Sequence, residues 1–103
     1  MEKHKRTYDL ESLKDAFSEV ESLGGKVTNA AFRGAQELGL SREDMIEVVQ
    51  SLKPRDFYKS MTSYADHRVW QDVYHAEHSD KGLYLKFTVK ADGDYLLLSF
   101  KEK

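Results

Sequence analysis

The sequence predicts an α+β protein, because its first half is patterned as helices and its second half as antiparallel strands. Three helix-like segments precede Pro54, each with apolar residues spaced three or four apart. Nine of the twelve aromatic residues lie at or after Phe57, in segments where apolar side chains alternate with polar ones. With 103 residues, the chain is expected to form a single domain, residues 1–103, with one modest core.

The first helix is predicted to begin after Asp9, a favourable N-cap residue, and to end at Gly24-Gly25. Apolar residues recur at helical spacing between these points and are expected in the core: Leu10, Leu13, Phe17, Val20 and Leu23. The segment 26–28 that follows is expected to be a short link or strand.

Two further helices are predicted from their capping residues. Thr28 or Asn29 caps the second, and Gly39 is placed to end it. Ser41 and Asp44 have the spacing of a capping box for the third, which Pro54 ends by restricting the residue before it. This third helix is expected to bury Met45, Ile46, Val48, Val49 and Leu52.

Strands are predicted over 69–74, 83–90 and 95–101, and a further strand over 59–64. The polar segment 75–82 is expected to be a break between strands. Residues 91–94, with the sequence Ala-Asp-Gly-Asp, carry a hairpin signal. The whole second half is therefore expected to be an antiparallel meander.

Alternation along these strands predicts which side chains share a face. Tyr84 and Lys86 lie opposite the apolar residues Leu83, Leu85, Phe87 and Val89. In the last strand, Leu96, Leu98 and Phe100 are expected on the apolar face, and Tyr95, Leu97, Ser99 and Lys101 on the other. If the helices cover the apolar face, Tyr84, Lys86 and Lys101 meet on the open face. For 69–74 the pattern leaves open whether the odd or the even positions face the core.

Interleaved lysines and tyrosines can neutralise phosphates and stack on bases. The same residue types are also ordinary on the solvated face of an antiparallel sheet. The formal net charge is −2, so any nucleic-acid site needs local positive charge that the average does not supply.

Composition excludes several other classes. There is no cysteine, which removes disulfides, thiol nucleophiles and Cys-based zinc sites. No apolar run approaches the ~20 residues of a membrane span, and the charged start leads into no signal-peptide core. A cytoplasmic protein is expected.

The histidines offer a weaker alternative. His75 and His78, near Asp72 and His67, are residue types that bind metals. Because segment 75–82 is expected to be a loop, it offers no fixed ligand geometry, and incidental surface histidines are the favoured interpretation.

Long blocks of the chain resemble one bacterial toxin family. They are Asp56-Phe-Tyr-Lys-Ser-Met-Thr-Ser-Tyr-Ala-Asp-His67, Trp70-Gln-Asp-Val-Tyr74, Tyr84-Leu-Lys86 and Leu98-Ser-Phe-Lys-Glu-Lys103. The start Met1-Glu-Lys3 and the helical Glu37-Leu-Gly-Leu40 match as well. Together they resemble the MqsR family over nearly the whole chain. The turns 75–82 and 90–94 depart from the family, and His75 stands where the family carries an arginine.

The resemblance implies a RelE-like α+β fold and an mRNA interferase that arrests growth and is linked to biofilm formation and persistence. Such toxins cut free single-stranded mRNA at GC-containing, GCU-like triplets with no metal or other cofactor. The implied partner is an MqsA-like antitoxin with a zinc-binding N-terminal domain and a helix-turn-helix C-terminal domain. Operator DNA would be contacted only through that complex, and no membrane is involved.

The resemblance also implies the site. Lys59, Gln71, Tyr84 and Lys101 match the family's residues for activity, while Tyr58, Lys86 and Ser99 are expected to contact RNA. Lys59 is hypothesised as base or phosphate clamp, Lys101 as the charge that stabilises the phosphorane, Tyr84 as proton donor or stacking ring, and Gln71 as a group that orients phosphate or reads a base. Crowding of the lysines is expected to lower one lysine pKa. The competing interpretation is a non-catalytic RNA-binding or protein-interaction module.

Overall fold

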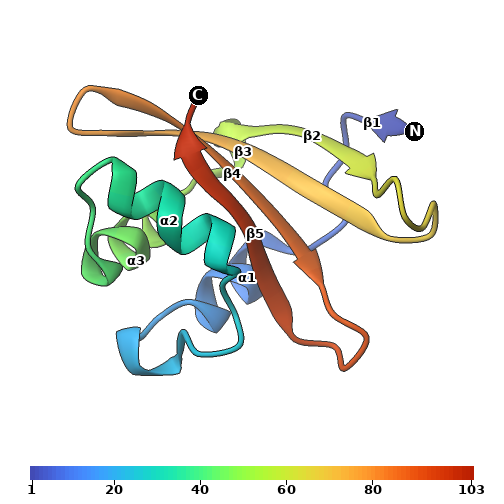
Figure 1. The fold of residues 1–103 in the computed structure, drawn as a ribbon. Helices are drawn as coiled ribbons and strands as arrows, with labels where there is room; N and C mark the ends of the chain where they lie inside the picture. The colour runs from blue at the N-terminus through green and yellow to red at the C-terminus, as the bar shows by residue number, and fades with distance from the viewer.

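The structure is a computed structural model that describes residues 1–103, with three helices packed on one face of a five-stranded antiparallel sheet (Figure 1). The helices are α1 (Leu10–Ala16), α2 (Asn29–Glu37) and α3 (Arg42–Gln50). The strands are β1 (Glu2–Lys3), β2 (Phe57–Thr62), β3 (Trp70–His78), β4 (Lys81–Val89) and β5 (Tyr95–Glu102). The predicted α+β class is confirmed, and the arrangement agrees with a RelE-like fold.

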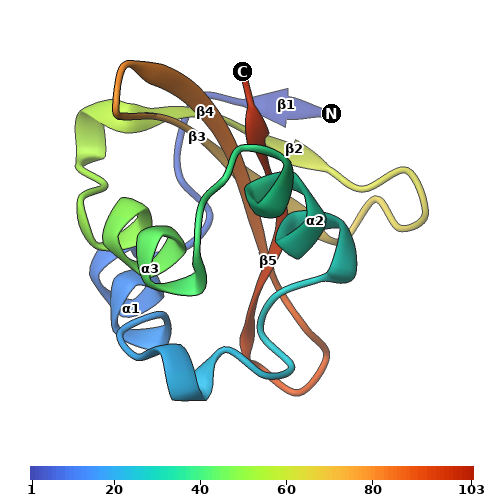
Figure 2. The ribbon, with the colours of Figure 1, turned by 60° about the vertical axis from the view of Figure 1, so that its left-hand side comes forward.

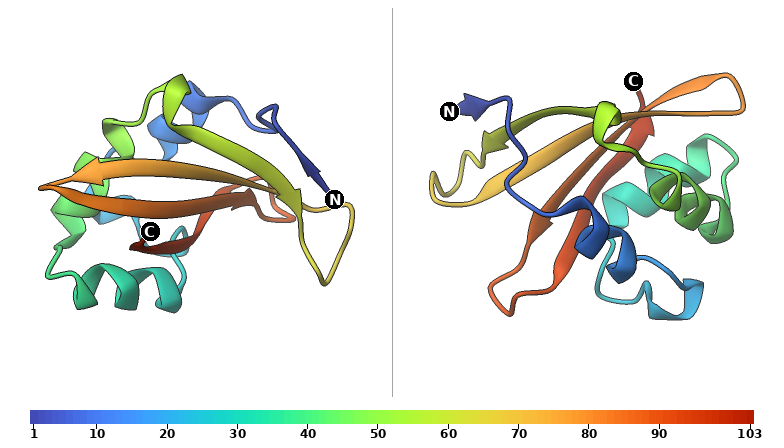
Figure 3. Two further views of the ribbon diagram at one scale, coloured as in Figure 1. Left: turned by 90° about the horizontal axis from the view of Figure 1, so that it is seen from above. Right: turned by 180° about the vertical axis from the view of Figure 1, so that it is seen from behind.

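Strand order in the sheet follows the order of the chain, from β1 at one edge to β5 at the other. The helices gather on one side of this sheet, which leaves the opposite face uncovered (Figures 2 and 3). Beyond β5, the segment predicted as a short link or strand forms a single parallel bridge between Val27 and Leu97. No helix is long and apolar enough to cross a bilayer.

One apolar core lies between the helices and the sheet. Its buried members are Leu10, Leu13, Phe17, Leu23, Val27, Ala31, Ala35, Met45, Val48, Val49, Leu52, Tyr74, Ala76, Leu83, Leu85, Phe87, Leu97 and Phe100. Tyr74 and Ala76 of β3 belong to this set, so the even positions of β3 face the helices and Gln71, Val73 and His75 face the open side.

The helix starts are those that the capping residues predict. Asp9, Thr28 and Ser41 each accept a hydrogen bond from the backbone N–H three residues on. Asp44 completes the capping box by accepting from the Ser41 N–H at 2.8 Å. Gly39, just past α2, has φ +73°, a conformation that favours glycine.

Helix α1 is shorter than predicted, since it ends at Ala16 and a separate 3₁₀ turn spans Val20–Ser22. Side chains from other parts of the chain donate hydrogen bonds to the backbone carbonyls that a longer helix would have paired with its own N–H groups. The Lys26 ammonium donates to the Ala16 carbonyl at 3.0 Å, and the Gln50 amide donates to the Phe17 carbonyl at 3.0 Å. These tertiary contacts offset the lost turn, which the local apolar spacing does not reveal.

The predicted break at 75–82 is wrong. Strand β3 continues to His78 and β4 begins at Lys81, so the connection is the two residues Ser79 and Asp80. Both have positive φ, 50° and 67°, as a tight two-residue hairpin requires. The segment is polar because it is the exposed end of a long hairpin.

The predicted apolar set of the last strand is also wrong in part. Register shifts between Lys86↔Ser99 and Phe87↔Leu97, so that Leu98 is an extra, bulged residue. Leu97 and Phe100 are buried, whereas Leu96 and Leu98 are only partly buried. The Thr28 hydroxyl donates to the Leu98 carbonyl at 2.8 Å, which satisfies the carbonyl of the bulged residue.

Two tertiary contacts attach other segments to the sheet. An added Cβ at Gly34 of α2 would lie 1.9 Å from the Phe100 carbonyl oxygen, so α2 rests directly on the backbone of β5. On β3, the central strand, the buried Asp72 carboxylate accepts the backbone N–H groups of Thr7 and Tyr8 at 3.0 and 2.9 Å. This contact ties the segment after β1 to the sheet.

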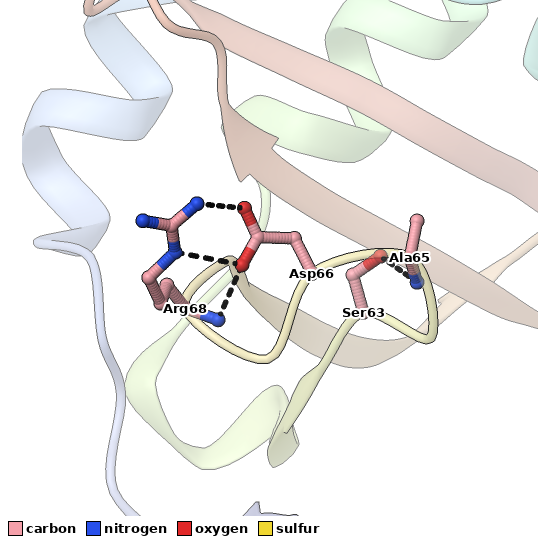
Figure 4. Close-up of polar contacts among 4 residues, drawn as sticks. All are labelled: Ser63, Ala65, Asp66 and Arg68. Carbon is pink, nitrogen blue, oxygen red and sulfur yellow. Dashed lines mark hydrogen bonds and ion pairs between the residues drawn. The ribbon is translucent and has the colours of Figure 1, made fainter.

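The β2–β3 loop is held by its own side chains (Figure 4). The Arg68 guanidinium donates twice to the Asp66 carboxylate, at 3.0 and 3.1 Å, and the Arg68 backbone N–H also donates to it at 2.9 Å. The Ala65 N–H donates to the Ser63 hydroxyl at 3.2 Å. The loop is therefore a structured end of the sheet.

Candidate functional site

The uncovered face of the sheet collects all seven residues that the sequence singles out. Together with His75 they are called the lysine–tyrosine face: Tyr58, Lys59, Gln71, His75, Tyr84, Lys86, Ser99 and Lys101. Four strands contribute, and the pairing of neighbouring strands fixes how the side chains are ordered across them.

One row crosses the sheet as Lys59, Val73, Lys86 and Ser99, each paired with the next. Lys59 comes from β2, Val73 from β3, Lys86 from β4 and Ser99 from β5. The buried Val73 side chain thus lies between two lysines. This row supplies local positive charge in a chain whose net charge is negative.

The adjacent row crosses as His75, Tyr84 and Lys101. The Lys101 ammonium lies 5.1 Å from the centre of the Tyr84 ring. A register shift between Phe57 and Lys59 bulges Tyr58 out of β2. Its ring stacks on His75 with centroids 4.2 Å apart and planes inclined by 21°.

Gln71 lies on the same face but farther from this second row. It pairs with Met61 of β2, two positions before Val73 along β3. The geometry thus brings Tyr84 and Lys101 into direct contact, places Lys59 and Lys86 in the neighbouring row, and leaves Gln71 at the periphery.

Lys59 is paired with an acid from the N-terminal strand. Its ammonium donates to the Glu2 carboxylate at 2.5 Å, and the edge strand β1 holds Glu2 there because Glu2 pairs with Met61 of β2. The hydrogen bond to Glu2 raises the pKa of Lys59. Lys59 therefore stays charged, which favours the phosphate-clamp role over the role of base.

Lys86 is the lysine whose pKa is lowered. Partial burial is the main cause, and the charge of Lys101 adds to it. Burial also raises the pKa of Tyr84, against a smaller opposing effect from Lys59. The Tyr84 hydroxyl therefore keeps its proton at neutral pH and is available as a donor.

His75 is the functional candidate that the sequence analysis set aside. It lies between Tyr58 and Tyr84, whose ring centre is 6.1 Å from its own. The signal that would have found it is the continued alternation Gln71, Val73, His75 along one strand. Burial, with a smaller effect from Lys103, lowers the pKa of His75.

His75 also lines a groove at the edge of the face. The groove has a volume of about 480 Å³ and is lined by Ser51, Lys53, Arg55, Asp56, His75, Ala76, Glu77, Gly82 and Lys103. Basic residues outnumber acidic ones in this lining. It extends the positively charged surface beyond the sheet.

The alternative metal site among the histidines is not formed. Asp72 faces the helices and is bonded to the N-terminal segment, while His75 faces the open side. No group of three or more His, Cys, Asp or Glu side chains lies close enough together to hold an ion.

The lysine–tyrosine face combines a protonated phenol, several ammonium groups and a neutral imidazole on neighbouring paired strands. Ammonium groups can balance the charge of a phosphate and of a phosphorane, the phenol can donate a proton, and exposed rings can stack on unpaired bases. These are the requirements for binding single-stranded RNA and for moving protons at a phosphodiester.

Comparisons with known proteins show the family of this chain. Residues 5–102 match the model of a family described as "Motility quorum-sensing regulator, toxin of MqsA". The chain is also 47% identical over 78 residues to the mRNA interferase toxin MqsR of Escherichia coli strain K12, and the aligned part covers 76% of this chain and 78% of that protein.

Proposed function

From the fact that the chain belongs to the MqsR family of toxins, we propose that it is an mRNA interferase, an endoribonuclease that arrests growth by cutting mRNA in the cytoplasm. Its substrate is single-stranded RNA, cut at GC-containing, GCU-like triplets without a metal. An MqsA-like antitoxin, with a zinc-binding N-terminal domain and a helix-turn-helix C-terminal domain, neutralises it and carries the pair to operator DNA.

The observation that carries the proposal is the contact between Tyr84 and Lys101 on the open face that also carries Lys59. Metal-free cleavage uses the ribose 2′-hydroxyl as nucleophile and leaves a 2′,3′-cyclic phosphate and a 5′-hydroxyl. The enzyme must stabilise a dianionic phosphorane and protonate the departing 5′-oxygen. A cation and a phenol in contact suit these two tasks.

The roles follow from protonation and position. Lys59, held as a cation by Glu2, clamps the scissile phosphate once RNA displaces the carboxylate. Lys101 stabilises the charge of the phosphorane, and Tyr84 donates a proton to the 5′-oxygen. Gln71, at the periphery, orients a neighbouring phosphate or reads a base edge.

The remaining face residues bind the strand. Tyr58 is about half exposed (49%) and offers the outer face of its ring to a base. Lys86 and Ser99 are paired across β4 and β5 beside Lys101, where they can contact adjacent phosphates.

The test is cleavage of a single-stranded RNA with one GCU triplet, in EDTA, with the purified protein. Discrete cuts with 2′,3′-cyclic phosphate ends are expected. A matched RNA with a 2′-deoxyribose at the cut site should bind but stay intact, because the nucleophile is missing. A gel shift without any cleavage would instead identify a non-catalytic RNA-binding module, and loss of cleavage in EDTA would identify a metal-dependent enzyme.

The partner is tested separately. Co-expression with an MqsA-like antitoxin is expected to restore growth and to give a complex that survives gel filtration. Failure of that protein to bind would refute the partner while leaving the cleavage assay unaffected.

A further inference from the structure

The mechanism above lacks a group that takes the proton from the 2′-hydroxyl. Lysine and tyrosine side chains ordinarily titrate near pH 10 and so carry their protons at neutral pH. Lys59 is held further toward its charged form by Glu2, and burial holds Tyr84 in its protonated form. Burial lowers the pKa of Lys86, but Lys86 lies in the neighbouring row and pairs with Val73 and Ser99, not with Tyr84. Among the side-chain types on the face, only an imidazole is ordinarily unprotonated and basic enough at neutral pH.

His75 is the one histidine of the lysine–tyrosine face, and it sits at the centre of the second row. The ring is partly exposed and is held by stacking on Tyr58, at 4.2 Å between centroids. Its cross-strand neighbour is Tyr84, the proposed acid, at 6.1 Å. A base and an acid must each come within about 3 Å of the oxygen they serve. Two rings at this separation can therefore reach the attacking 2′-oxygen and the leaving 5′-oxygen of one phosphodiester.

We propose that His75 is the general base of this chain, accepting the proton of the attacking 2′-hydroxyl while Tyr84 protonates the leaving oxygen. The assignment rests on the proposed RNA cleavage and deepens it.

The step balances without a co-reactant. The 2′-oxygen gives its proton to the imidazole and forms a bond to phosphorus, while the bond from phosphorus to the 5′-oxygen breaks. The 5′-oxygen takes the Tyr84 proton, and Lys101 stabilises the phenolate that remains. Water then returns the imidazolium proton to the phenolate, which restores both groups for the next cut.

The surroundings of His75 determine how it titrates. The titratable groups around it are Tyr58 and Lys59 from β2, Tyr84 and Lys86 from β4, Glu77 on its own strand, Lys103 at the end of the sheet, and Lys53, Arg55 and Asp56 across the groove. Burial and the charge of Lys103 lower the pKa of His75 from its ordinary 6.5. The imidazole is therefore neutral at pH 7, and activity should fall as pH drops through that lowered pKa.

The experiment measures single-turnover cleavage of the GCU-containing RNA between pH 5 and 9. The variants are His75→Gln, His75→Ala with and without added imidazole, and the control His78→Gln, three residues along the same strand on its other face. Binding of the 2′-deoxy RNA is measured for each, and the His75 ring is titrated by NMR in the unmodified protein.

The wild-type rate should rise tenfold per pH unit on the acid side, with a midpoint that agrees with the NMR titration of His75. His75→Gln should be about 10²–10⁴-fold slower at pH 7 and lose this acid limb. It should bind 2′-deoxy RNA normally. Imidazole should restore cleavage to His75→Ala, and His78→Gln should match the wild type.

Three results would overturn the assignment: an acid limb that survives in His75→Gln, RNA binding lost in parallel with cleavage, or a kinetic midpoint that disagrees with the NMR titration. The last comparison needs no variant, so it decides the matter even if His75→Gln does not fold. If the wild type cleaves RNA and any of these results is found, only the role of His75 as base is rejected. If the wild type does not cleave RNA, the proposed function is rejected as well.

Discussion

Tyr84 can act on RNA through its hydroxyl or through its ring, and Tyr84→Phe separates the two. Burial raises the pKa of Tyr84, and the Lys101 ammonium lies over its ring at 5.1 Å. If the hydroxyl protonates the leaving oxygen, Tyr84→Phe should cut about 10²–10⁴-fold more slowly with unchanged affinity for 2′-deoxy RNA. Tyr84→Ala should also weaken binding, because stacking is lost. Normal cleavage by Tyr84→Phe would leave the ring with a binding role only.

Tyr74 presents the opposite case, a hydroxyl that costs stability. Its side chain is fully buried, and the hydroxyl has no hydrogen-bond partner. Removing an unsatisfied buried group should stabilise the fold, so Tyr74→Phe is expected to raise the free energy of unfolding by about 1 kcal/mol. Thermal denaturation should show a rise of roughly 4–8 °C.

The control for this prediction is Tyr8→Phe. The Tyr8 hydroxyl donates to the Trp70 carbonyl at 2.8 Å, so its loss should lower stability by about 0.5–1.5 kcal/mol. Equal changes in the free energy of unfolding for Tyr74→Phe and Tyr8→Phe would show that the two hydroxyls do not differ in their hydrogen bonding.

At the scale of the strands, alternation predicted the open face correctly and the apolar face of β5 only in part. Tyr84, Lys86 and Lys101 were assigned to one face, and the strand pairing agrees. Leu96 and Leu98 were misassigned because the bulge at Leu98 reverses the alternation before it. The contact that satisfies this bulge comes from Thr28, 70 residues away in sequence. No local pattern carries that information.

His75 was missed for a related reason. A polar run after Tyr74 was expected to be a loop, and polar residues at the exposed end of a hairpin look the same in sequence. Only the pairing of His75 with Tyr84 shows that the strand continues. The helix caps at Asp9, Thr28 and Ser41, by contrast, depend on residues three apart and were predictable.

The contact of α2 with β5 gives a prediction at the same scale. Gly34→Ala would normally favour a helix by about 1 kcal/mol, but its Cβ would lie 1.9 Å from the Phe100 carbonyl oxygen. The helix or the strand must shift, which should lower stability by about 1–3 kcal/mol. Cleavage should fall as well, because Lys101 is the next residue of β5.

Gly24→Ala is the matched control, because no atom lies within 4 Å of its added Cβ and its φ is not in the left-handed region. Urea denaturation and the cleavage assay should leave Gly24→Ala near the wild type. A stable and active Gly34→Ala would mean that the close approach has no role in placing Lys101.

For the molecule as a whole, charge is distributed unevenly. The net charge is −2, yet the face carries Lys59, Lys86 and Lys101 against Glu2, a sum of three positive charges and one negative, or +2. If these three lysines each neutralise one phosphate, a plot of the logarithm of the RNA-binding constant against the logarithm of the salt concentration should have a slope of about −2. Each phosphate of a single strand contributes about −0.7 to this slope.

The salt dependence can be assigned to the face by one pair of variants. Lys86→Gln should make the slope shallower by about 0.7. Lys81→Gln, at the exposed tip of the β3–β4 hairpin, should leave it unchanged. Equal slopes for the two would place the RNA on another surface, which filter binding across a salt series would reveal.

The order of the strands has a consequence for folding kinetics. Strands β2 to β5 pair in the order in which they follow one another, so each closes onto the last through a short connection. The pairing of β1 with β2 and the contact of α2 with β5 join distant parts of the chain, and closing long loops costs more entropy. We expect the hairpins to form first and these two contacts to form after the main folding barrier. Changes at Gly34 would then speed unfolding and leave the refolding rate almost unaltered. The surface proposed to bind RNA would thus be assembled before the helices pack against the other face of the sheet.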